Sequence, residues 1–193
     1  GSTNVSILDS TLKSNQNGFV SYGSEGVLKN NTIQNNSEFG VRIYSGSDVG
    51  FEITKNTINE NRVGIGARAG EISSNILSDN DIGISVEYIK GESLNPTNRV
   101  TVNNNIIRGS TQTDFLTRNK NAKRTQATDL SLEGTTVSFD ARSISVKAVT
   151  APDSGPSSAQ VIGQPLELSA PPTDRYRGSS YPSGSYLNVT MDY

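Results

Sequence analysis

Two sets of side chains in the first half of the sequence are spaced so that their members could lie close together and act as one site. The first set is acidic apart from one arginine, and its members are Glu60, Arg62, Asp79 and Asp81. If their segments lie on neighbouring strands about 4.8 Å apart, the carboxylates of Glu60 and Asp79 would approach to about 5 Å. Such a pair can act as acid and nucleophile, or bind a hard cation, for which Ca²⁺ is the candidate. The alternative is that these acidic groups face solvent at a corner and that Arg62 neutralises them.

The second set combines aromatic and charged side chains: Tyr22, Arg42, Tyr44, Arg68 and Glu87. Aromatic rings can stack on the CH faces of sugars, and guanidinium groups pair with carboxylates. On one flat sheet these residues would make a track for a polysaccharide, with uronate or sialate groups as the partners of the arginines. The alternative is that like residues on adjacent strands stabilise the sheet surface and bind nothing.

Composition excludes several kinds of chemistry. The 193 residues carry a net charge of −2 and include no cysteine and no histidine. Disulfides, thiol nucleophiles, histidine-based metal sites and Ser-His-Asp triads are therefore excluded. Apart from the candidate Ca²⁺ we expect no cofactor or metal, and the near-neutral charge argues against a nucleic-acid partner. No apolar run approaches the roughly 20 residues that span a bilayer, so we expect no membrane insertion.

Internal repeats are the elements that must position both sets of residues. Each repeat has an anchor position with an apolar residue three positions before it and another two positions after it, and a second asparagine five positions after it. The anchor is occupied by Ser10, Asn31, Asn56, Asn75 and Asn105. The second asparagine is Asn15, Asn36, Asn61 and Asn80, and it is followed by a glycine that opens the next strand. Anchors recur at intervals of roughly 19 to 30 residues, which is typical of a solenoid with one coil per repeat.

Stacked coils explain why strand-like segments contain so many asparagines. Equivalent side chains of successive coils lie over one another, so columns of asparagine can hydrogen-bond their amides in a structural ladder. Asparagine at a bend also tolerates the left-handed backbone that a corner requires. Segments such as "NNTIQNNSEFGV" and "SNILSDNDIGISV" resemble the right-handed parallel β-helix superfamily typified by pectate lyases. The resemblance implies an all-β fold, a parallel β-helix solenoid of about five coils over residues 3–120.

The composition changes after residue 120. Residues 121–150 are interpreted as a capping hairpin or an irregular last coil, with apolar alternation on both sides of a "DAR" turn at 140–142. Residues 151–193 are rich in proline, serine and glycine and predict an extended tail that ends in a strand, which pairs in this chain or with a neighbour. Such a tail resembles those of trimeric bacteriophage tailspikes, which implies a homotrimer. Gly1 and Ser2 are interpreted as the remnant of an expression tag, so a fragment of a longer protein is expected.

Three classes of function fit the sequence. The first is a structural, carbohydrate-contacting β-helix of a secreted or phage-tail protein, with a polysaccharide as partner and an extracellular or virion-surface location. The second is a polysaccharide lyase or glycoside hydrolase acting on an acidic glycan, with its active site partly upstream of this fragment. The Gly-His-Gly motif of polygalacturonases is missing, and "GVRIY" only faintly resembles their Arg-Ile-Lys segment. The third is an adhesin or scaffold without a ligand here.

Overall fold

The computed structural model describes most of the solenoid and parts of the C-terminal region. The described residues are 4–44, 51–88, 100–119, 125–132, 135–141, 143–148, 166–169 and 186–190. The loops expected between repeats, at 44–50 and 88–99, lie almost wholly outside this set, as does most of the tail expected over 151–193.

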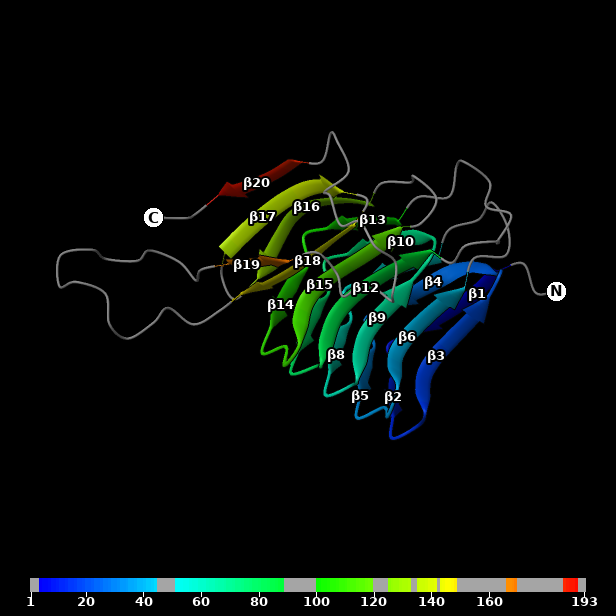
Figure 1. Cartoon of the computed structure of the whole chain (residues 1–193). Helices are drawn as coiled ribbons and strands as arrows, with labels where there is room; N and C mark the ends of the chain where they lie inside the picture. The colour runs from blue at the N-terminus through cyan, green and yellow to red at the C-terminus, as the bar shows by residue number, and fades with distance from the viewer. Residues whose placement is uncertain are drawn as a thin grey trace.

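Five coils of three short strands each make up the body of the chain (Figure 1). Coil 1 contains β1 (Asn4–Leu8), β2 (Thr11–Lys13) and β3 (Asn17–Tyr22). Coil 2 contains β4 (Glu25–Lys29), β5 (Thr32–Gln34) and β6 (Phe39–Tyr44), and coil 3 contains β7 (Phe51–Thr54), β8 (Thr57–Asn59) and β9 (Val63–Ala67). Coil 4 contains β10 (Gly70–Ser73), β11 (Ile76–Ser78) and β12 (Ile82–Tyr88), and coil 5 contains β13 (Val100–Asn103), β14 (Ile106–Arg108) and β15 (Thr113–Asn119).

Each strand pairs in parallel with the equivalent strand of the next coil. Leu28 of β4, for example, is in register with Ile7 of β1 and with Ile53 of β7. The first and second strands of the coils belong to a 13-stranded sheet, here called sheet A, and the third strands belong to a 7-stranded sheet, sheet B. The predicted all-β parallel solenoid of about five coils is therefore confirmed. Among the described residues no helix is long and apolar enough to span a membrane.

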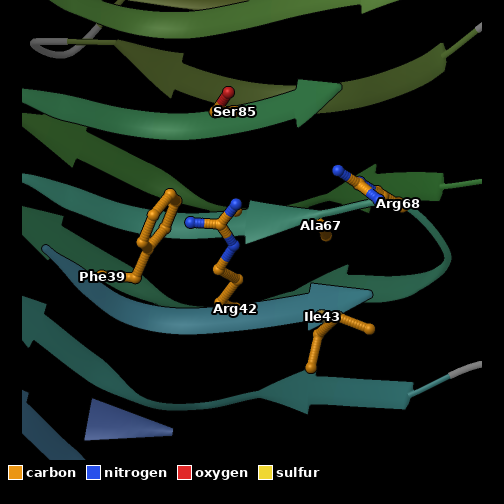
Figure 2. Close-up of a pocket in the computed structure, with 7 residues that line it drawn as sticks. Phe39, Arg42, Ile43, Ala67, Arg68 and Ser85 are labelled. Atoms are coloured by element: carbon orange, nitrogen blue, oxygen red, sulfur yellow. The ribbon is translucent and has the colours of Figure 1, made fainter. Parts of the chain in front are cut away.

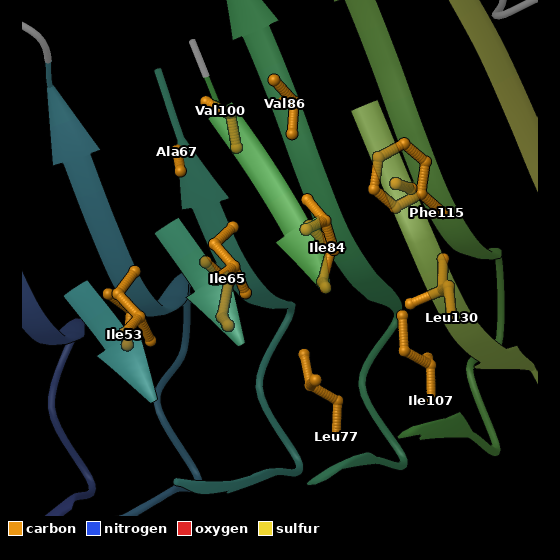
Figure 3. Packing of buried hydrophobic residues seen from close by; sticks show 14 of the residues in the cluster. Ile53, Ile65, Ala67, Leu77, Ile84, Val86, Val100, Ile107, Phe115 and Leu130 are labelled. Atoms are coloured by element: carbon orange, nitrogen blue, oxygen red, sulfur yellow. The ribbon is translucent and has the colours of Figure 1, made fainter. Parts of the chain in front are cut away.

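The inward-facing apolar residues form columns along the axis of the solenoid, as Figure 3 shows. The residues three before and two after each anchor in coils 2 to 5 are completely buried: Leu28, Ile33, Ile53, Ile58, Ile72, Leu77, Val102 and Ile107. A third column from sheet B includes Val41, Ile65, Ile84 and Phe115. Because each residue packs between the coil before and the coil after, truncation of one of them to alanine should cost about 2–5 kcal/mol.

The corners between strands carry left-handed residues, but these are not the ladder asparagines. Positive φ values occur one residue earlier, for example at Asn30 (57°), Lys55 (56°) and Glu60 (56°). The expectation that asparagine at a bend tolerates this conformation is confirmed at Asn30, Asn35 and Asn104. The side chains of the ladder asparagines must turn inward and their N–H groups must reach the next coil, so the preceding residue makes the turn. Its own N–H then bonds to the next coil, as in Lys55 N–H to Ser73 O at 3.2 Å.

The parallel stack continues past residue 120. β16 (Thr125–Leu132) pairs in parallel with both β13 and β14, and so forms part of a sixth coil. β17 (Thr135–Ala141) is antiparallel to β16, whereas β18 (Ser143–Ala148) is antiparallel to β15 in sheet B. The strands on the two sides of the expected "DAR" turn therefore pair in different sheets, so that turn does not join a hairpin.

Two short strands are described in the C-terminal tail. β19 (Leu166–Ser169) pairs with β18, and β20 (Tyr186–Thr190) pairs with β17, both antiparallel. The terminal strand therefore pairs within this chain.

Candidate functional site

The first asparagine column is a continuous ladder inside the solenoid. The side-chain amide of Asn31 donates to Asn56 Oδ1 at 3.0 Å, Asn56 donates to Asn75 Oδ1 at 2.9 Å, and Asn75 donates to Asn105 Oδ1 at 2.9 Å. The backbone N–H of each donates to the same oxygen. At the start of the column, the backbone N–H of Ser10 donates to Asn31 Oδ1 at 2.9 Å.

The second column forms a shorter ladder of the same design. Asn36 donates to Asn61 Oδ1 at 2.9 Å, and Asn61 donates to Asn80 Oδ1 at 3.1 Å. Asn15 contributes its backbone N–H, at 3.1 Å from Asn36 Oδ1, while its side chain is exposed. The amides of the buried asparagines also donate to main-chain oxygens of the coil before, as in Asn80 Nδ2 to Ile58 O at 3.0 Å. Because these amide groups are already hydrogen-bonded within the solenoid, the ladders hold the coils together and have few groups left for a ligand.

The outer face of sheet B brings together four residues of the aromatic and charged set. Tyr22 and Tyr44 stack with ring centroids 4.5 Å apart and planes 4° from parallel. The Arg42 guanidinium carbon lies 4.6 Å from the Tyr44 centroid, and that of Arg68 lies 5.0 Å from it. Tyr22 is 74% exposed, so the outer side of the stack is open to solvent. Glu87 is in β12, but its side chain lies outside the described residues.

Phe39 belongs to the same surface, although the sequence did not point to it. Its ring centroid is 4.1 Å from the Arg42 guanidinium carbon and 5.5 Å from that of Arg62. The ring crosses to the next coil and covers Gly66: a Cβ at that glycine would meet Phe39 Cε1 at 2.6 Å. The second repeat has one residue more than the others between its second asparagine and its glycine, and Phe39 lies in that segment. This extra residue and a glycine in the outward position of "GIGAR" were the available signals. We call Tyr22, Phe39, Arg42, Tyr44 and Arg68 the aromatic–arginine face.

A shallow hollow lies beside Arg42 on this face. Its lining includes Phe39, Arg42, Gly66, Arg68 and Ser85, and Figure 2 shows the Phe39 ring and the Arg42 guanidinium side by side over β9. Each cation–π contact at such a surface stabilises by about 0.5–1 kcal/mol. Together these contacts favour the observed positions of the aromatic rings and of the guanidinium groups when no ligand is bound. The surface is therefore a platform in which aromatic rings and positive charges alternate.

The acidic set gathers at the second corner, around an open depression. Glu60, Arg62, Asp79 and Asp81 all line it. Arg62 stands in register between Glu38 of coil 2 and Asp81 of coil 4, since Val63 N–H bonds to Glu38 O and Ile82 N–H to Arg62 O. Charges of alternating sign in one column attract one another, which favours the interpretation that Arg62 neutralises this corner.

The Asp79 carboxylate is directed toward coil 5, on the side away from Glu60. A Cβ at Gly109 would lie 2.4 Å from Asp79 Oδ1, so this oxygen occupies the space that the glycine leaves. Asp81 accepts from the Thr111 hydroxyl at 2.8 Å, also on coil 5. Within the described ranges no group of three or more acidic side chains is arranged to hold a metal ion. The Glu60–Asp79 pair considered for Ca²⁺ is therefore joined by no third acidic ligand among these residues.

A solenoid of parallel coils, with buried amide ladders and an exposed platform of rings and guanidinium groups, defines the protein as a parallel β-helix. A family model described as a right-handed β-helix region matches residues 1–143, and the chain belongs to this family. This match also assigns the hand of the coil. Neither the comparison with curated proteins nor that with solved structures gave a significant match.

Proposed function

We propose that the aromatic–arginine face binds a polysaccharide and that the acidic groups of the glycan pair with its arginines. The observation that carries the proposal is the stack of Tyr22 on Tyr44 with Arg42 held between Tyr44 and Phe39. Tyrosine offers an apolar ring with a polar tip, which suits a sugar, and arginine is the preferred partner of carboxylates.

The ordering of this surface before binding supports the proposal. A ligand that meets side chains already fixed by their neighbours loses less conformational entropy than one that must order them. Arg42 and Arg68 belong to this face, and their positive charge would attract an anionic chain in a manner that salt weakens. The alternative, a purely structural stack, accounts for the ring contacts but predicts no ligand.

Direct binding to a panel of acidic and neutral polysaccharides tests the proposal. We expect an acidic glycan to bind, Tyr22→Ala or Tyr44→Ala to weaken it about 5-fold, and Arg42→Ala about 10-fold. Leu8→Ala and Arg108→Ala are matched controls, because both residues are exposed on sheet A. Affinity that is unchanged in both the Tyr44 and Arg42 variants would rule out this face as the binding site.

The same preparation tests the other expectations. A lyase or hydrolase would release unsaturated products or reducing ends from the panel, and binding without release favours a non-catalytic domain. A polysaccharide partner would suit an extracellular or virion-surface location. Light scattering tests the homotrimer that the resemblance to phage tailspikes implies.

A further inference from the structure

One column of outward positions on sheet B contains two small residues between two large ones. Arg42 of β6 is in register with Gly66 of β9, and Gly66 is in register with Ser85 of β12. Leu116 of β15 is next in the column and is almost fully buried. Because Gly66 has no side chain, the hollow on the aromatic–arginine face stays open between Arg42 and Ser85 (Figure 2).

Arg42 is positioned at the edge of this hollow by two aromatic rings. Its guanidinium carbon lies 4.1 Å from the Phe39 centroid and 4.6 Å from the Tyr44 centroid. Stacking on rings uses the flat faces of a guanidinium group and leaves its edge of N–H donors for other partners. Within the described part of the chain, neither these donors nor the Ser85 hydroxyl forms a hydrogen bond. Both are therefore available to a group that enters the hollow.

The size and the polarity of the hollow indicate what kind of group would fit. Its volume is about 40 Å³. A single water molecule needs about 10–15 Å³ of such space, so the hollow admits a group of a few atoms and no sugar ring. Arg68 adds a second positive charge to the lining, and the described residues that line the hollow include no acidic side chain. A small anion with at least two acceptor oxygens is therefore the matching group.

We propose that this hollow is the subsite for one carboxylate of a sugar acid in the bound glycan. The two carboxylate oxygens would accept from the edge of Arg42, which suits a bidentate pair, and one of them would also accept from the Ser85 hydroxyl. The inference rests on the polysaccharide function proposed above, and it adds the position of the acidic group and a specificity-determining residue, Ser85. Uronates and sialates both carry such a carboxylate.

Single sugars test the subsite by nuclear magnetic resonance without requiring the right polymer. Sodium glucuronate supplies a uronate carboxylate, N-acetylneuraminate supplies a sialate carboxylate, and glucose supplies neither. One of the two acids should shift the main-chain amide signals of Gly66 and Ser85, which identifies the source, and glucose should leave them unchanged. Ser85→Ala should weaken this binding about 5-fold. Arg42→Lys should weaken it by a similar factor, because lysine keeps the charge but not the fork of donors.

Filling the hollow gives a second test. Leu116 shows that this column accommodates a leucine, so we expect Ser85→Leu to fold with little change in Tm. Because the leucine occupies the place of the carboxylate, this variant should bind the acid sugar, and an acidic polysaccharide, at least about 10-fold more weakly. Ser78→Ala is the matched control, since Ser78 is half-buried on sheet A and does not line the hollow.

The inference and the proposed function fail in different ways. Unchanged affinity in Ser85→Leu, for a polysaccharide whose binding depends on Tyr44 and Arg42, would overturn the subsite and leave the function in place. Equal shifts with a sulfated glucose, equally reduced in Ser85→Ala, would overturn the assignment to a carboxylate, as would the absence of shifts with both acids. Binding of no polysaccharide in the panel would instead remove the proposed function and, with it, the glycan subsite.

Discussion

The asparagine ladders at the corners inside the solenoid and the aromatic–arginine face on its outside follow the same stacking rule. Inside, Asn56 accepts two hydrogen bonds from Asn31 and donates to Asn75 and to two main-chain oxygens. Outside, Tyr22, Tyr44 and Arg42 contact one another through flat surfaces, and the platform stays open to solvent. Stacking like residues stabilises both columns, but only the outer one keeps surface that a ligand can reach.

The difference teaches how a β-helix separates stability from recognition. An inward position is enclosed by the coil before, the coil after and the opposite strands, so its residue type is dictated by packing and hydrogen bonding. An outward position is restrained only by its neighbours along the column. Changes inside should therefore alter the free energy of unfolding, and changes outside should alter affinity.

The largest effect should come from breaking a ladder at its centre. Asn56→Ala removes the acceptor of Asn31 N–H and of one Nδ2 hydrogen, while the Nδ2 bond to Ile7 O remains. Two buried N–H groups are left unpaired, and a cavity is created. Each unpaired donor costs about 1–3 kcal/mol, so we expect a loss of about 3–5 kcal/mol in the free energy of unfolding. Chemical denaturation measures it.

A matched substitution shows whether the ladder itself is responsible. Asn59 is in the same coil and only half-buried, and it accepts from the ladder through its main-chain oxygen alone, which Asn59→Ala retains. We expect that variant to lose less than about 1 kcal/mol. Equal losses for Asn56→Ala and Asn59→Ala would contradict the structural role given to the ladder.

Two glycines in one strand of coil 3 allow a sharper comparison of inside with outside. A Cβ at Gly64 would meet the main-chain oxygen of Gly83 at 2.6 Å and Leu77 Cδ2 at 2.9 Å, so Gly64→Ala must separate packed coils. At Gly66 the new Cβ meets only the Phe39 ring, which can swing away. We expect Gly64→Ala to cost about 2–3 kcal/mol and Gly66→Ala less than about 1 kcal/mol.

Affinity should show the opposite order for the two variants. The displaced Phe39 ring supports Arg42, so Gly66→Ala should weaken binding of an acidic polysaccharide about 3-fold. Gly64→Ala, measured well below its Tm, should bind as the unchanged protein does. Binding by isothermal calorimetry checks both variants, and weaker binding by Gly64→Ala than by Gly66→Ala would contradict the separation of the two sides.

The repeats made the buried core and the asparagine ladders of this molecule predictable. Because each residue type recurs at the same place in successive coils, the alignment predicted which apolar residues are buried and which asparagines stack. The register of Tyr22 with Tyr44 followed from the same alignment and is the one observed. The β16–β18 region repeats nothing, so its pairing, with β17 on sheet A and β18 on sheet B, could not be read in this way.

Contacts that cross between coils were harder to predict. Phe39 reaches over Gly66 on a different strand, and Asp79 leans over Gly109 of coil 5, since a glycine there leaves room. Each depends on a rotamer choice that no single repeat encodes. The residue that turns at each left-handed corner could not be read from residue type either, because Lys55 and Glu60 adopt this conformation as Asn30 does. The hydrogen bonds of the ladder decide where the chain turns.

The smallest effect should come from lengthening the second ladder by one rung. Ser110 follows the left-handed Gly109 just as Asn80 follows the left-handed Asp79, and its Oγ is buried without a partner. In Ser110→Asn the new Oδ1 would lie where Asn80 Oδ1 lies one coil earlier, and could accept from Asn80 as Asn80 Oδ1 accepts from Asn61 at 3.1 Å. The variant gains one buried hydrogen bond and loses the unpaired hydroxyl, so it should be more stable by about 1 kcal/mol, with a rise in Tm of roughly 2–4 °C.

Ser110→Ala separates the two contributions, because it removes the unpaired hydroxyl and adds no acceptor. If Ser110→Asn is no more stable than Ser110→Ala, the second ladder does not extend to coil 5, and its end at Asn80 reflects the local backbone of that corner.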